Sequence, residues 1–293
     1  MHRWMGISLA ACVAATVWAA AETAGGGTLS RLVGAQAAAG NAQSGTAGGQ
    51  AGAASPAKGV AAEQAPTADQ ILQRYVQALG GEKALRKITS RLMKGKFEAP
   101  MPQPADAEHK ITGDAEILTA APELFYSRVN LGEEGVFISA YDGKVGWSSD
   151  PRGVREMQGQ ELETMRRSSQ FQHELRFREI FPQVRVLEKA SEEDRPVWVL
   201  EATPAEGGPE KFYFDAETGL LLRHDSTQFS QGEEVPIEHR YSDYAPVDGV
   251  QVPHVLRHKD PNVEWQVTFT EVRQNVPVDA ARFSMPSAAP APH

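Results

Sequence analysis

The sequence predicts an α+β domain: a large curved antiparallel sheet, forming an incomplete β-barrel of about eleven strands, with N-terminal helices and an inserted helical lid. Near residue 90 the hydrophobic period changes from helical to alternating, and about eleven short alternating runs follow. Most loops between these runs are of hairpin length. Parallel strands would need crossovers of about a dozen residues, so short loops favour antiparallel pairing. A sheet of this width has to curl in order to bury one face.

Two short helices begin the folded domain. Thr67 and Gln70 have the spacing of a capping box, in which each side chain accepts a hydrogen bond from the other residue's backbone N–H. Gly80 and Gly81 mark the end of the first helix, and a second helix is predicted over 82–88. The apolar residues of the first helix, at helical spacing, are Ile71, Leu72, Tyr75, Val76 and Leu79.

The strand runs are recognised by alternation and by the turn residues between them. The first run, 91–98, places Met93, Gly95 and Phe97 on one face and mostly charged residues on the other. Asp142-Gly143 lies between two runs and is typical of a two-residue hairpin. The further runs are 109–119, 124–131, 136–141, 144–148, 184–189, 197–203, 211–215, 220–229, 236–244, 251–258 and 263–272.

One helical segment, 159–181, interrupts the strands. It carries Leu162, Met165, Phe171 and Leu175 among many charged residues, and it is predicted to break near Ser168-Ser169. An amphipathic segment inserted between strands can cover the concave face of an open sheet as a lid. It can equally complete a packed core, and the pattern alone does not decide between these two roles.

Residues outside the domain predict export and a tether. Residues 1–21 have the charged start, apolar run and small-residue cleavage site of a signal peptide. Residues 22–66 hold 14 Ala and 10 Gly and no aromatic residue, which predicts a disordered tether that cannot form a core. The folded domain is expected over 67–286, followed by a disordered tail, 287–293. The location predicted is therefore periplasmic.

The single cysteine of the chain, Cys12, follows Leu9-Ala10-Ala11, a sequence that resembles the acylation site of bacterial lipoproteins. Lipid anchoring through Cys12 is a minority alternative, because the apolar run continues past Cys12 to Ala21. Cleavage after Ala21 would leave a chain without cysteine, and hence without disulfide or thiol chemistry.

The charge balance excludes some classes of partner. The chain has 29 basic and 38 acidic residues, a net charge of −9. Nucleic acids and anionic membrane surfaces are bound by clustered cations, so we expect no nucleic-acid partner. The chain is expected to act as a monomer without cofactor or metal.

The sequence contains no complete catalytic motif of the kinds considered below. His173-Glu174 begins like a zinc-protease motif, but Phe177 stands where the second histidine is required. His254 and His258 are too far apart along an extended strand to hold one zinc ion. No Gly-x-Ser-x-Gly motif is present. We therefore expect no enzyme. A hydrolase is the least favoured alternative and would need carboxylates and histidines converging in a cavity.

Aromatic and aliphatic residues on the strand runs are the candidates for ligand binding. Most strand aromatics pack in cores, but a wide half-barrel with few helices leaves inward residues to line a cavity. The assignment depends on strand register, since a slip of one residue reverses the faces. The predicted cavity residues are Met93, Phe97, Phe125, Val129, Phe137, Trp147, Met165, Phe171, Leu175 and Trp265.

Several segments resemble one family of periplasmic domains. The helical start 68–85 with Gly95 on the next strand, the hairpin 213–221, and the segments 241–244 and 247–253 are similar to the lipoprotein-carrier (LolA/LolB-like) superfamily, which includes outer-membrane lipoprotein-sorting proteins. The resemblance covers 67–286. It implies an incomplete antiparallel barrel with helices over its open mouth, and an apolar cavity for acyl chains.

Together, these observations predict non-catalytic periplasmic binding of a lipid or lipidated group, for envelope lipid or lipoprotein transport. The expected partners are lipid or lipoprotein acyl chains and, secondarily, an envelope protein. The alternative is a non-catalytic interaction module with a fully packed core.

Overall fold

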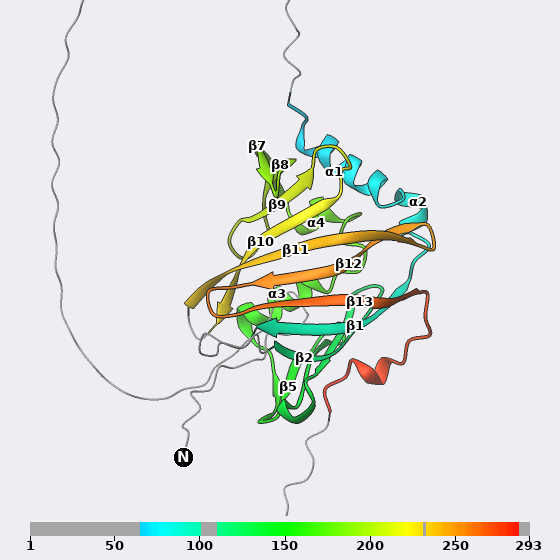
Figure 1. Ribbon diagram of the computed structural model, residues 1–293, viewed down its shortest axis with the longest axis vertical. Helices are drawn as coiled ribbons and strands as arrows, with labels where there is room; N and C mark the ends of the chain where they lie inside the picture. The colour runs from blue at the N-terminus through cyan, green and yellow to red at the C-terminus, as the bar shows by residue number, and fades with distance from the viewer. Residues whose placement is uncertain (1–64, 101–109, 231–232, 287–293) are drawn as a thin grey trace, which may run out of the picture. The chain divides into compact units, whose positions relative to one another are not determined.

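The computed structural model describes residues 65–100, 110–230 and 233–286 (Figure 1). The predicted signal peptide with Cys12, the predicted tether up to residue 64, and the predicted tail 287–293 lie outside the described residues. Within the described part of the chain, no helix is both long and apolar enough to cross a membrane.

The first helix is confirmed. Helix α1, Ala68–Ala78, begins with the predicted capping box: Thr67 Oγ1 accepts from the Gln70 N–H at 3.2 Å, and Gln70 Oε1 accepts from the Thr67 N–H at 2.8 Å. Helix α2, Glu82–Leu85, is shorter than predicted and ends before Ile88. Both helices bury their apolar side chains against one half of the sheet.

The described residues form one antiparallel sheet of thirteen strands in the order β6-β5-β4-β3-β2-β1-β13-β12-β11-β10-β9-β8-β7. Strands β6 and β7 are its two edges, so the sheet curves without closing into a barrel, as predicted. The strands are β1 Ser90–Pro100, β2 Lys110–Ala120, β3 Leu124–Asn130, β4 Val136–Tyr141, β5 Gly146–Asp150, β6 Gly153–Glu156, β7 Gln183–Glu192, β8 Arg195–Thr203, β9 Glu210–Asp215, β10 Leu221–Ser230, β11 Glu233–Val247, β12 Val250–Lys259 and β13 Glu264–Gln274.

The expected number of strands, about eleven, was too low. Strand β6 was missed because its four residues are mostly exposed and carry no alternating apolar pattern. It is recognisable only from its pairing with β5, where Ser149 lies opposite Val154. The hairpin predicted at Asp142-Gly143 is confirmed in position, since it joins β4 to β5, but its loop spans the four residues 142–145 instead of two.

The inserted segment lies between β6 and β7 in the chain and breaks where predicted. Helix α3, Gly159–Ser168, is followed by an irregular stretch and then by helix α4, Phe177–Ile180. Figure 1 shows α3 and α4 on one side of the strands. We call the sheet face that they cover the inner face.

The strand register assigns side chains to the two faces. On the inner face, Met93 lies opposite Ile117, which lies opposite Ser127. On each of these strands, the adjacent residue along the chain points to the outer face. These residues form a second row, which packs with Phe283 of the C-terminal segment. This outer row, strand by strand, is Leu92, Leu118, Tyr126, Ala140 and Trp147.

Gly95 allows two strands to approach closely in the middle of the sheet. A Cβ atom at this position would lie 2.1 Å from the Thr268 carbonyl oxygen, so no other residue fits without movement of the backbone. The β1–β13 register shifts here, between Lys94 and Gly95. Such a bulge bends the strands and contributes to the curvature that forms the inner face.

Candidate functional site

Nine of the ten predicted cavity residues lie on the inner face or on the segment that covers it. They divide among three packed clusters. Met93, Phe97, Val129, Phe137 and Trp265 pack together; Phe125 and Met165 belong to a second cluster; Phe171 and Leu175 pack against a third, which includes α1.

Trp147 was assigned to the wrong face. The register places it opposite Ala140 in the outer row, and its Nε1 donates a hydrogen bond of 2.7 Å to the Phe283 carbonyl. It is 3% exposed because the C-terminal segment covers it. The prediction placed this strand one residue out of register. A shift of one residue moves every side chain of a strand to the opposite face of the sheet.

A first cavity lies between the inserted segment and the β1–β3 half of the inner face. It has a volume of about 180 Å³, and we call it the Arg91 cavity. Three of the predicted residues, Met93, Phe125 and Phe171, line it. Its other walls are Leu85, Ile88, Arg91, Ile117, Thr119, Ser168, Ser169, Gln170, Gln172, His173 and Glu174.

A second cavity of about 130 Å³ lies under the same segment, toward β9–β11, and we call it the Phe212 cavity. Its apolar walls are Ile180, Phe181, Phe212 and Leu221, and it shares Ser168 and His173 with the Arg91 cavity. The two cavities therefore meet at the irregular part of the inserted segment. None of the ten predicted residues lines the Phe212 cavity.

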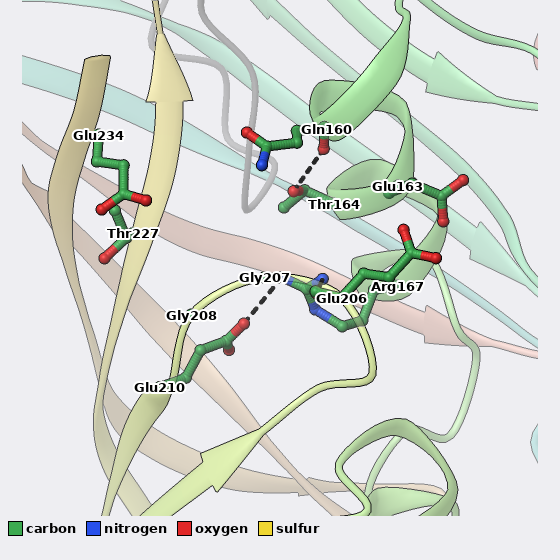
Figure 2. Close-up of a pocket in the computed structure, with 10 residues that line it drawn as sticks. All are labelled: Gln160, Glu163, Thr164, Arg167, Glu206, Gly207, Gly208, Glu210, Thr227 and Glu234. Carbon is green, nitrogen blue, oxygen red and sulfur yellow. Dashed lines mark hydrogen bonds and ion pairs between the residues drawn. The ribbon is translucent and has the colours of Figure 1, made fainter. Parts of the chain in front are cut away.

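A polar hollow of about 110 Å³ adjoins the Phe212 cavity, with four residues common to both (Figure 2). Arg167 of α3 reaches across it to Glu210 of β9, with Arg167 Nη2 donating to Glu210 Oε1 at 2.9 Å. His224 Nε2 donates to the other Glu210 oxygen at 2.7 Å. Burial raises the pKa of Glu210, but the hydrogen bond from His224 and the charge of Arg167 outweigh burial and leave the pKa lowered.

Three histidines form a row across the inner face that sequence reasoning missed. His224, His239 and His258 lie directly opposite one another on β10, β11 and β12. Two aromatic rings flank the row. The ring centroid of Phe212 lies 4.2 Å from that of His224, and the ring centroid of Trp265 lies 4.7 Å from that of His258. The signal was absent from the sequence because these residues are 15 and 19 positions apart, and only the register aligns them.

In the histidine row, both ring nitrogens of His258 contact neighbouring side chains. His258 Nδ1 lies 3.0 Å from His239 Nε2, and His258 Nε2 lies 3.3 Å from Asp260, so its nitrogens bond along the row. Among the described residues, no three His, Cys, Asp or Glu side chains are placed to hold one metal ion. His254, which the sequence places too far from His258 to share a zinc ion, bonds to the Val252 carbonyl.

The inner face also carries polar atoms without partners. Of the described residues, six have a buried side-chain nitrogen or oxygen with no hydrogen bond: Arg91, Ser127, Ser139, His239, Trp265 and Gln274. The register places all six on the inner face. Buried polar groups are normally hydrogen-bonded. Of these six residues, Arg91 also lines one of the two cavities.

Comparison with known proteins gives matches in structure alone. No family model matches the sequence, and no curated protein matches it. Three similar solved structures each resemble most of the chain at low identity, as follows. A domain described as an outer membrane lipoprotein-sorting protein from Vibrio parahaemolyticus has 11% identity and a TM-score of 0.50, over 73% of this chain and 94% of its own.

The second structure, a DUF1329 family protein from Desulfovibrio piger, has 12% identity and a TM-score of 0.52, over 74% and 96% of the two chains. The third, a LolA superfamily protein from Nitrosomonas europaea, has 14% identity and a TM-score of 0.50, over 75% and 98%. Identities this low establish shared architecture only. With the open thirteen-stranded sheet and its covering helices, these matches show that the chain has a LolA/LolB-like fold.

Proposed function

We propose that the protein is a non-catalytic periplasmic binding protein that holds a lipid or lipidated group between the inner face and the inserted segment 159–181. The observation that carries the proposal is the pair of adjoining, largely apolar-walled cavities under this segment. Two solved structures that share the fold are described as a lipoprotein-sorting protein domain and a LolA superfamily protein, which is consistent with this use of the fold.

Helix α3, the first part of the inserted segment, has the properties of a movable cover, whereas Phe177 and Phe181 at the end of the segment are buried in the core. In α3, Met165 is the residue that is buried, and its other side chains are charged or partly exposed. Because α3 buries few apolar contacts, its local opening mainly requires the loss of two ion pairs, Arg155–Glu161 and Arg167–Glu210. Burial of an acyl chain would then stabilise the complex by about 0.8 kcal/mol per methylene group.

The proposal includes the predicted organisation of the chain: export by residues 1–21, a tether over 22–66 and a single binding domain over 67–286. A tether of this composition would let the domain move near the envelope while it exchanges acyl chains. We also propose that the domain acts as a monomer in envelope lipid or lipoprotein transport, with an envelope protein as a further partner.

The test is uptake of phospholipid measured by native mass spectrometry. The Phe171→Asp/Leu175→Asp variant introduces charge where both side chains of the inserted segment pack against the cluster that includes α1, so we expect uptake at least about tenfold weaker, since burying a charge in an apolar site is unfavourable. Val154→Asp, at an exposed position on β6, is the matched control and should bind as the wild type does. A folded double variant with unchanged uptake would contradict the role of the segment.

A second candidate, the interaction module with a packed core, is favoured by one observation. Phe97, Met165 and Trp265 are at most 2% exposed and line neither of the two cavities. An apo mass for the wild type, unchanged after lipids are offered, would support this alternative.

The hydrolase alternative gains little from the structure. His224 and Glu210 do converge at the Phe212 cavity. However, neither Ser226 nor Thr227, the hydroxyl residues beside them on β10, hydrogen-bonds to His224 in the described structure. A nucleophile paired with a base is therefore not formed there.

A further inference from the structure

Arg91 is a cation placed under the inserted segment with little to neutralise it. It lies on the inner face at the start of β1, opposite Gln274 and Thr119, and it lines the Arg91 cavity. Its Nε atom is buried and has no hydrogen-bond partner among the described residues. A guanidinium group has five N–H donors in a planar fork that matches phosphate or carboxylate oxygens.

The surroundings of Arg91 are unfavourable for an isolated charge. Leu85, Ile88, Met93 and Phe125 form apolar walls beside it. Burial lowers the pKa of Arg91, and the nearby Glu174 and Tyr75 raise it by less than burial lowers it. An incoming anion would thus find a partly desolvated donor, where a charge-assisted hydrogen bond is stronger than at an exposed surface.

Glu174 supplies the opposite charge in the same cavity. It belongs to the inserted segment, lines the Arg91 cavity, and has a side chain that is 9% exposed. The ionisable group in contact with it is the imidazole of His173, with Nδ1 at 3.5 Å, and that side chain is 54% exposed. The negative charge of Glu174 is close enough to raise the pKa of Arg91. The two side chains nevertheless do not form an ion pair with each other in the described structure.

We propose that the Arg91 cavity binds a zwitterionic head group, a phosphate on Arg91 with an ammonium group beside Glu174, carried by an amphiphile whose acyl chains lie along the inner face. This inference rests on the proposed function and names its ligand class. Two opposite charges that share one apolar-walled cavity without pairing are complementary to such a group, and to neither a purely anionic nor a neutral head group. Phosphoethanolamine, free or as part of a phospholipid, has this chemistry.

The experiment measures dissociation constants by isothermal titration calorimetry with three probes: short-chain phosphatidylethanolamine, phosphatidylglycerol with the same chains, and free phosphoethanolamine. The wild type should bind phosphatidylethanolamine about tenfold more tightly than phosphatidylglycerol, because one charge-assisted contact separates them. Glu174→Gln should remove this preference. Arg91→Gln should weaken both lipids about tenfold. Arg257→Gln, an exposed cation on the outer face that bonds to Gln266, is the control and should change neither.

Each contrary result has its own meaning. Equal binding of the two lipids by the wild type, with Glu174→Gln unchanged, would overturn the head-group site and leave the proposed function standing. Absence of binding by any lipid would overturn the proposed function itself. If free phosphoethanolamine binds as tightly as the lipid, the acyl chains do not contribute to binding, and the proposal that the head group belongs to a lipid is overturned. If Arg91→Gln does not fold, the affinities of the wild type and of the Arg91→Lys variant for the two lipids still decide whether the head-group site exists.

Discussion

The surroundings of His239 strongly oppose protonation of its imidazole. Its side chain is 3% exposed in the middle of the histidine row, between His224 and His258. Burial lowers its pKa well below the ordinary value, and the charges that His258 and His224 would carry lower it further. The folded protein therefore keeps this imidazole neutral under conditions where an exposed histidine is protonated.

This burial predicts acid sensitivity. Unfolded chains protonate His239 near its ordinary pKa of about 6.5. Because the folded pKa is lower, the unfolded state binds more protons as pH falls below this value, and the free energy of unfolding decreases by up to about 1.4 kcal/mol per pH unit. Urea unfolding of the wild type and of His239→Gln between pH 7.5 and 5 checks this: the variant should show the shallower loss. Parallel pH profiles would contradict it.

The other residue-scale features were predictable to different degrees. Met93 and Phe97 were assigned to the correct face, since they alternate along one strand whose neighbours are charged. Trp147 was not, because its strand is short and its outer face is covered by a distant segment. Arg91 was missed altogether, since nothing in the sequence indicates that a strand arginine will be covered by residues 168–174.

At the scale of elements, helix α3 is held to the sheet at its two ends. Near its start, Glu161 accepts from Arg155 Nη1 of β6 at 2.8 Å. Near its end, Arg167 pairs with Glu210, and these side chains are 20% and 6% exposed. Between these points Met165 provides the buried contact. The Arg167–Glu210 pair is the connection between α3 and the β9–β10 side of the Phe212 cavity.

Loss of this pair should release α3 locally. Arg167→Gln removes a charge-assisted hydrogen bond of about 1.5–3 kcal/mol, so amide exchange over 159–168 should become roughly tenfold faster or more. Hydrogen–deuterium exchange with mass spectrometry measures this segment by segment. Arg166→Gln is the control, because Arg166 pairs with Glu163 at the exposed surface, where such pairs contribute about 0–1 kcal/mol. Equal exchange in both variants would show that the pair does not hold the helix.

At the scale of the whole molecule, the outer face of the β1–β5 half depends on the C-terminal segment. Phe283, which follows the short helix η2, Ala280–Arg282, is fully buried against the outer row that contains Trp147. Arg282 also donates to Glu116 of β2 at 2.6 Å. Segments far apart in the chain therefore close one face of the sheet together.

Removing the Phe283 side chain should destabilise the whole domain. Phe283→Ala leaves a cavity over Trp147 and should lower the free energy of unfolding by about 3–5 kcal/mol, measured by urea denaturation. Val278→Ala, at a position that is 37% exposed in the same segment, should have little effect. If the two variants unfold alike, the C-terminal segment is not part of the cooperative core.

The sequence alone determined the features that depend on neighbours along the chain. The capping box at Thr67, the change of period near residue 90, the hairpin at Asp142-Gly143 and the break at Ser168-Ser169 are all local signals, and each was found where predicted. The tertiary structure alone decided what depends on strand register and distant contacts. It aligned His224, His239 and His258, moved Trp147 to the outer face, and placed Glu174 near Arg91 across 83 positions of the chain. Register is set by the pairing of whole strands, so one residue's neighbours along the chain do not reveal its neighbours in space.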